Sequence, residues 1–166
     1  MLRILIAGAG RVGLSVASHL RTLGHNVTIL DRDPAVVSRA FEQHALIALQ
    51  GDATDAGLLR AAEVERADVV VAMLRRDADN LAVALLAKSA GVERIMVRMR
   101  DTEYRRVYLD NGVDRVLSEV EVLLGAFATA IEHEHVQSSM LLGKGDTVAF
   151  ELAIEHRQQR GEGAEV

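Results

Sequence analysis

The sequence predicts an α/β fold: a Rossmann-like, doubly wound parallel sheet of six strands, with a C-terminal crossover helix and an extra strand. Three observations predict it. Short apolar runs alternate with stretches of helical periodicity along most of the chain. Several runs are apolar at consecutive positions, as expected for parallel strands covered by helices on both faces. A glycine motif lies between the first run and the first helical stretch, where this fold binds phosphate groups.

The elements follow in chain order. Val12, Val16 and Leu20 have the spacing of one apolar helix stripe. Asp33 followed by Pro34 predicts an N-cap and a first helical position. An alanine- and leucine-rich helix is expected over 77–90, ending before a glycine. The six expected strands are 2–7, 26–30, 45–49, 68–72, 94–97 and 115–117.

The last third of the chain has a different pattern. Residues 118–135 predict a longer helix with apolar side chains on more than one side. Turn residues at 143–146 precede a final expected strand at 147–154. The residues from 156 onward form a polar tail with two glycines, for which we expect disorder.

Composition limits the classes of function. The net charge of −5 argues against general nucleic-acid binding, which favours a basic face. The sequence holds no cysteine, which excludes disulfides and thiolate metal sites. Its longest apolar runs, 69–74 and 81–87, fall short of the roughly 18 residues that span a bilayer. The first strand pattern begins at once and leaves no room for a signal peptide, so we expect a soluble, cytoplasmic protein.

The glycine motif predicts a nucleotide site. Gly8, Gly10 and Gly13 form G-x-G-x-x-G after a strand and at the start of a helix. In this motif the first glycine allows a tight turn, the second lets a phosphate approach, and the third lets helix and strand pack closely. Asp31 ends the second strand, where an acid accepts hydrogen bonds from ribose and disfavours a 2′-phosphate. The alternative is that the glycines only shape a turn.

Polar residues at two further strand ends are expected in the crevice where this fold binds its ligands. Asp52 follows the third expected strand. It could contact a ligand, or it could serve only as a turn or cap residue. Arg98 and Arg100 end the fifth expected strand. They could pair with phosphate groups of a ligand, or they could be solvated surface arginines. The acids and histidines of 132–135 resemble a metal cluster, but residues two apart on a helix face different ways. We interpret that segment as a solvated face.

The sequence resembles the potassium-transport nucleotide-binding family, also called KTN, TrkA-N or the N-terminal lobe of RCK domains. The resemblance covers residues 1 to about 140. It implies a homodimeric regulatory domain, in octameric rings in the full system, that binds NAD(H), ATP, ADP or AMP and gates an integral-membrane potassium channel or transporter. The stretches that carry it are 4–13, 27–31, 51–54, 67–72, Asp77 with Asn80, and 111–117.

By motif position, the resemblance also implies the ligand-binding residues. Arg11 occupies a slot where some members bind a neighbour's nucleotide phosphate, and Glu119 matches a glutamate that some members use for a cation. No catalytic residue is implied. The full implied set is Gly8, Ala9, Gly10, Arg11, Val12, Gly13, Asp31, Arg32, Asp52, Ala53, Met73, Leu74 and Arg98.

The sequence departs from the family pattern in four places. Ser118 replaces a proline before Glu119, which puts the cation role in doubt. Arg98 and Arg100 stand where calcium-gated relatives carry glutamates. Residues 73–76 replace small polar residues, so the far end of a dinucleotide would be bound differently. Residues 1–166 do not include the family's usual C-terminal lobe beyond its expected first strand at 147–154, so we expect a fragment or a short version. The resulting domains are 1–135 for nucleotide binding, 136–155 for a linker and the start of a truncated or absent lobe, and 156–166 for the tail.

Three other functions stay open. The domain could regulate a potassium/proton antiporter, or sense redox or energy state for another partner. It could also be a soluble NAD-dependent oxidoreductase, because fold alone does not fix function. Such an enzyme normally adds a substrate domain with a general acid or base, for which this chain leaves little room. We therefore expect a regulatory domain and not an enzyme.

Overall fold

The computed structural model describes residues 1–132, 136–142 and 147–152. The chain divides into two compact units, residues 1–119 and residues 120–166. Four expectations fall partly or wholly outside the described residues: the end of the long helix at 133–135, the turn at 143–146, the end of the last strand at 153–154, and the polar tail.

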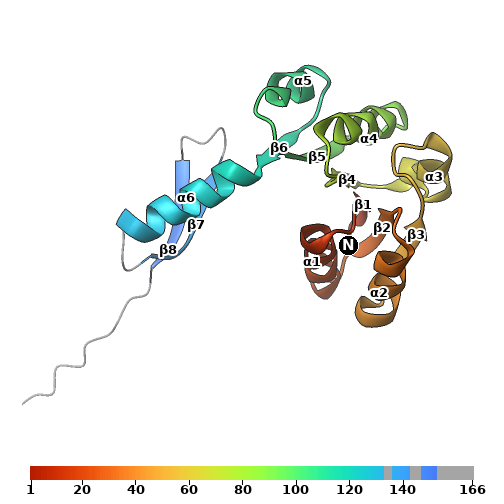
Figure 1. Ribbon diagram of the computed structural model, residues 1–166, viewed down its shortest axis with the longest axis horizontal. Coiled ribbons are helices and arrows are strands. Elements are labelled where there is room, and N and C mark those ends of the chain that lie inside the picture. The colour runs from red at the N-terminus through yellow and green to blue at the C-terminus, as the bar shows by residue number, and fades with distance from the viewer. Residues whose placement is uncertain (133–135, 143–146, 153–166) are drawn as a thin grey trace, which may run out of the picture. The chain divides into compact units, whose positions relative to one another are not determined.

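The first unit confirms the doubly wound parallel sheet (Figure 1). Its six strands are all parallel and lie in the order β3-β2-β1-β4-β5-β6. The order reverses between β1 and β4, which creates a crevice at the carboxyl ends of these two strands. The strands are β1 (Arg3–Ala7), β2 (Asn26–Asp31), β3 (Ile47–Gln50), β4 (Val69–Ala72), β5 (Arg94–Met99) and β6 (Arg115–Ser118).

Helices connect the strands in the expected alternation. Asp33 caps α2 as its sequence predicts, because its carboxylate accepts a hydrogen bond from the Ala35 N–H at 2.9 Å. The third strand begins two residues later than expected, because Ala45 ends α2 in a left-handed conformation with φ of 47°. The helices are α1 (Arg11–Thr22), α2 (Pro34–His44), α3 (Ala56–Ala61), the 3₁₀ turn η1 (Val64–Arg66), α4 (Asp77–Ser89) and α5 (Tyr104–Asp110).

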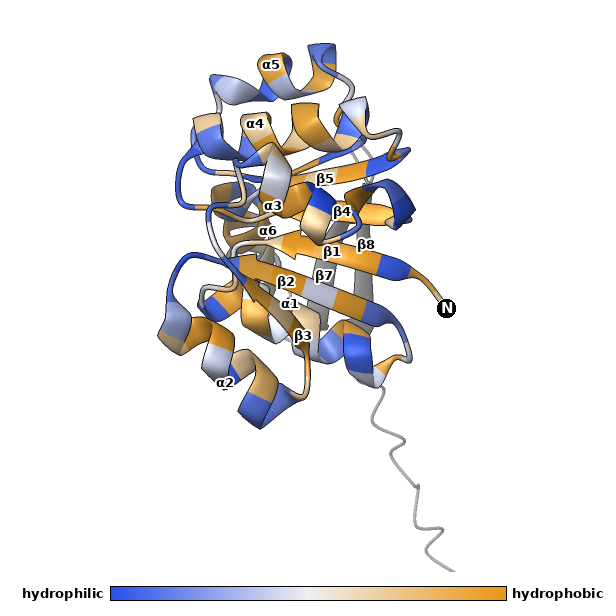
Figure 2. Cartoon of the chain, turned by 90° about the vertical axis from the view of Figure 1, so that its right-hand side faces the viewer, coloured by the Kyte–Doolittle hydropathy of each residue, from blue (hydrophilic) through white to orange (hydrophobic). Residues whose placement is uncertain are grey.

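Two apolar clusters fill the two faces of the sheet, and the strands between them are strongly hydrophobic (Figure 2). Alternate residues of β1 divide between the clusters: Ile4 and Ile6 join the α1 and α2 side, and Leu5 and Ala7 join the α3, α4 and α5 side. The central strands are therefore buried on both faces, which is why the sequence shows runs rather than alternation.

The second unit contains most of α6 (Glu119–Glu132) and two strands, β7 (Val136–Leu142) and β8 (Thr147–Leu152). The strands pair antiparallel. The sequence pattern predicts one strand here and places residues 136–142 in a linker, so β7 is an addition to the predicted fold. None of the helices among the described residues is long and apolar enough to cross a membrane.

Candidate functional site

The glycine loop lies at the crevice between β1 and β4. It follows Ala7, the last residue of β1, and leads into α1 at Arg11. The Gly8 N–H donates to the Leu30 carbonyl of β2 at 2.8 Å, and the Met73 N–H donates to the Ala7 carbonyl at 2.8 Å. The loop is therefore held by both strands that flank β1.

The fold itself requires two of the three motif glycines. Gly8 has φ of 100°, in the left-handed region, and a Cβ there would lie 2.9 Å from the Met73 carbonyl oxygen. A Cβ on Gly13 would overlap the Gly8 carbonyl oxygen. These glycines let α1 start directly against the end of β1, as the motif predicts.

Gly10 is different, because nothing in the described part of the protein requires a glycine there. Its φ of −59° suits any residue, and a Cβ at this position would meet no atom within 4 Å. Gly10 is also the N-cap of α1 and makes no side-chain cap. The N–H groups of Arg11, Val12 and Gly13 have no hydrogen-bond acceptor within the described part of the chain, so the loop offers free donors beside an open space.

Asp31 links the glycine loop to the end of β2. One carboxylate oxygen accepts the Ala9 N–H at 2.8 Å, and the other accepts the Asp33 N–H at 2.9 Å. A carboxylate has about four acceptor positions, so two remain for a ligand's hydroxyl groups. The acid therefore shapes the loop and keeps the capacity to bind ribose.

Asp52 forms a turn after β3, as one of its two sequence interpretations predicts. Its carboxylate accepts hydrogen bonds from the Thr54 N–H at 3.0 Å and the Thr54 hydroxyl at 2.7 Å. Arg32 pairs with it at 3.2 Å. The two bonds from Thr54, followed by the charge of Arg32, lower the pKa of Asp52. Ala53 packs into the core, so a ligand role for its side chain stays a prediction.

Asn80 holds the loop that follows β4. Its side-chain oxygen accepts the Leu74 N–H at 2.7 Å, and its amide donates to the Arg98 carbonyl at 2.9 Å. One buried side chain therefore joins the end of β4 to the end of β5. Asn80 is predicted only through the family resemblance, where it stands with Asp77.

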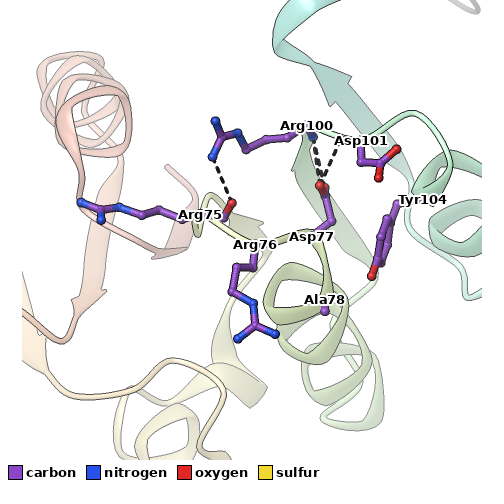
Figure 3. Close-up of a pocket in the computed structure, with 7 residues that line it drawn as sticks. All are labelled: Arg75, Arg76, Asp77, Ala78, Arg100, Asp101 and Tyr104. Atoms are coloured by element: carbon purple, nitrogen blue, oxygen red, sulfur yellow. Dashed lines mark hydrogen bonds between the residues drawn. The ribbon is translucent and has the colours of Figure 1, made fainter.

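Asp77, at the start of α4, holds the segment that follows β5 (Figure 3). Its buried carboxylate accepts the Arg100 N–H at 3.1 Å, the Asp101 N–H at 3.0 Å and the Tyr108 hydroxyl at 2.9 Å. Burial, and then the hydrogen bond to Asp77, raises the pKa of Tyr108. This network fixes the Arg98–Arg100 strand end against the β4–α4 loop. Spacing alone could not reveal it, because Asp77 and Tyr108 lie 31 residues apart.

Arg98 and Arg100 both face Glu119. The Arg98 Nε lies 2.7 Å from one carboxylate oxygen of Glu119, and the Arg100 Nε lies 3.8 Å from the other. The Arg98 contact is an ion pair without hydrogen-bond alignment, so its buried Nε has no hydrogen-bond partner among the described residues. Glu119, which the family resemblance offers as a cation ligand, pairs with both arginines, and its cation role stays a prediction. The described residues include no group of three His, Cys, Asp or Glu that could hold a metal ion.

These contacts join three parts of the predicted site. Asp31 holds the glycine loop, Gly8 packs on the β4–α4 loop, and Asn80 ties that loop to Arg98. Free N–H donors, an open space at Gly10 and a buried arginine atom without a hydrogen-bond partner fit a phosphate-bearing ligand. Arg11 and Val12 are exposed beside the loop. The ion pair of Arg32 and Asp52 joins the residues that follow β2 and β3, on the side of β1 away from β4.

Comparison with known proteins gives consistent matches. The family profile of the TrkA-N domain matches residues 4–119. A "Trk system potassium uptake protein TrkA homolog" of Methanothermobacter thermautotrophicus is 28% identical over 151 residues, which cover 91% of this chain and 70% of that protein. The "Trk system potassium uptake protein TrkA" of Mycobacterium tuberculosis is 34% identical over 132 residues, which cover 78% of this chain and 60% of that protein.

A solved structure is similar over the same region. The Kef C-terminal domain of Shewanella denitrificans, solved in an AMP-bound form, is 28% identical, with a TM-score of 0.65. The match covers 79% of this chain and 82% of that one. Sequence and fold therefore agree over the part of the chain that contains the glycine loop.

Proposed function

This chain belongs to the TrkA-N domain family, and from this premise we propose that it is a nucleotide-binding regulatory domain that gates a potassium channel or transporter. The ligand is NAD(H) or an adenine nucleotide. Names of the relatives support the potassium system, and the AMP-bound Kef domain supports the ligand class. The domain acts at the cytoplasmic face of the membrane through its integral-membrane partner.

The observation that carries the proposal is the open space at Gly10. Backbone strain explains Gly8 and close packing explains Gly13, but neither explains Gly10. A phosphate that approaches the start of α1 does explain it, because a side chain there would occupy the ligand's place. Asp31, with acceptor positions left for ribose hydroxyls, favours a ligand without a 2′-phosphate.

Regulation requires that the ligand bind two conformations of the domain with different affinities. The site residues suggest where such a difference would arise. Asn80 and Asp77 join the ends of β4 and β5, and Arg98 reaches Glu119 at the start of α6. A ligand that attracts Arg98 would compete with Glu119, which links occupancy of the crevice to the helix that leads into the second unit.

Substitution of Gly10 tests the function. Gly10→Asp puts a side chain and a negative charge where the phosphate would lie. We expect it to abolish binding of NAD(H), ATP, ADP and AMP in calorimetry. In the reconstituted transport system, we expect potassium flux to lose its response to nucleotide. The control is Gln43→Glu, which adds the same charge on an exposed position of α2.

Two outcomes would contradict the proposal. One is an equal nucleotide response of flux in wild type and Gly10→Asp. The other is tight binding of NADP(H) together with no binding of NAD(H), ATP, ADP or AMP, which lack a 2′-phosphate. Hydride transfer by the isolated chain would favour the oxidoreductase alternative, which a fold alone does not exclude.

We also propose a two-fold homodimer built partly on α6. This helix has no buried residue, and apolar patches of this kind mark interaction sites. We expect Leu124→Glu with Phe127→Glu to shift the mass in light scattering from dimer to monomer. Phe41→Glu, at an exposed apolar position of α2, is the control and leaves the mass unchanged. A wild-type protein that is monomeric at high concentration would contradict this proposal. The exposed apolar residues of α6 are Val120, Val122, Leu123, Leu124, Phe127 and Ile131.

A further inference from the structure

A pocket lined by three arginines lies beyond the ends of β4 and β5 (Figure 3). Its volume is about 470 Å³. Arg75 and Arg76 come from the β4–α4 loop, and Arg100 comes from the segment directly after β5. The pocket therefore continues the carboxyl edge of the sheet on the side of the β1–β4 crevice away from β2 and β3.

The two acidic residues that line this pocket, Asp77 and Asp101, accept hydrogen bonds from groups other than the arginine side chains. Asp77 is buried, and backbone N–H groups and Tyr108 satisfy its carboxylate. Asp101, which is exposed, accepts the Glu103 N–H at 3.0 Å. Both acids thus fix the backbone around the pocket, and neither forms an ion pair with Arg75 or Arg76 in the described part of the chain.

The three arginines differ in how strongly they are held. Arg75 forms no hydrogen bond or ion pair through its guanidinium among the described residues, and Arg76 has only a 3.9 Å approach to Asp79. Arg100 donates to the Arg75 carbonyl at 3.3 Å, and its Nε lies 3.8 Å from Glu119, so both contacts hold its guanidinium over the loop. Two guanidinium groups are therefore available to an anion, and the third is already positioned beside them.

The pocket and the glycine loop share the β4–α4 loop. Met73 at its start contacts the glycine loop, and Arg75 and Arg76 follow two and three residues later. Their Cα atoms lie at most roughly 7 and 11 Å from that of Met73. Figure 3 shows the Arg75 side chain directed away from α4, toward the ribbon of the N-terminal segment that contains β1 and α1. A ligand that starts at the glycine loop can thus extend to these arginines.

We propose that Arg75, Arg76 and Arg100 bind the terminal phosphates of an adenosine polyphosphate. The inference rests on the proposed nucleotide site and specifies its ligand. Guanidinium groups form their strongest contacts with phosphate, and each added phosphate increases the attraction. The far end of NAD⁺ instead carries a positively charged nicotinamide ring, which the same arginines repel. ATP and ADP therefore bind more tightly than AMP or NAD⁺.

The double variant Arg75→Ala with Arg76→Ala tests the proposal in calorimetry on the full chain. Both side chains are exposed, so the fold does not depend on them. We expect the affinity for ATP to fall at least roughly tenfold, the scale of a lost charge-assisted contact. The affinity for AMP changes less than about twofold, since AMP has no terminal phosphates to reach these residues. Affinity for ATP should also become less sensitive to salt.

Two controls accompany the double variant. Arg75→Lys with Arg76→Lys keeps the charge and retains most of the preference for ATP over AMP. Arg94→Ala removes an exposed arginine at the opposite end of β5 and leaves both affinities unchanged.

The same measurements separate a failure of the arginine proposal from a failure of the proposed function. If wild type binds ATP and AMP equally, or if the double variant weakens both equally, the arginine proposal is wrong and the nucleotide site stands. If wild type binds no adenosine ligand, the proposed function itself is wrong.

Discussion

Gly13→Ala should destabilise the domain by about 3 kcal/mol, the upper end of the usual cost of overpacking. The added Cβ overlaps the Gly8 carbonyl oxygen, a backbone atom that has no rotamer with which to move aside. The start of α1 must then separate from the end of β1, where Leu14 and Ala17 pack against the sheet. Urea denaturation of both proteins gives the two free energies of unfolding.

Gly10→Ala is the matched control for this prediction. Its Cβ meets no atom within 4 Å and its φ is already negative, so the free energy of unfolding should change by less than about 1 kcal/mol. A loss of stability at Gly10 equal to that at Gly13 would show that the space at Gly10 is not open. Equal stability of Gly13→Ala and wild type would show that α1 does not pack against the Gly8 carbonyl.

Asp77→Ala should also cost about 3 kcal/mol or more, for a different reason. The substitution leaves the Arg100 N–H and the Asp101 N–H without their acceptor, while the Tyr108 hydroxyl keeps the backbone carbonyl of residue 77, at 2.9 Å. Unsatisfied groups of this kind are expensive when water cannot replace the lost partner, and the Asp77 carboxylate that accepts both N–H groups is buried. The measurement is again urea denaturation.

Asp79→Ala is the control in the same helical turn. Among the residues that the structure describes, the Asp79 side chain approaches only Arg76, at 3.9 Å, so its removal should change the free energy of unfolding by less than about 1 kcal/mol. Tyr108→Phe should cost about 1 kcal/mol, since Asp77 keeps its two backbone donors. An Asp77→Ala protein as stable as the Asp79→Ala protein would refute the role of the network.

Local sequence patterns were enough to predict the parallel sheet and the place of the glycine loop. Both depend on local signals: consecutive apolar residues in buried strands, and glycines at fixed spacing between a strand and a helix. Asp31 was predictable for the same reason, because the end of β2 lies beside the end of β1 in this fold. The cap at Asp33 needs only its own neighbours in the chain.

The contacts between the loops that follow the strands became visible only in the folded protein. Nothing local distinguishes Asp77, which accepts three hydrogen bonds inside the protein, from Asp79 two residues later, which remains near the surface. The pairing of Arg98 with Glu119 and the gathering of Arg75, Arg76 and Arg100 likewise join residues more than 20 positions apart. The physical reason is that parallel strands bring their carboxyl ends to one edge, while the orientation of each side chain there depends on the segments that pack around it.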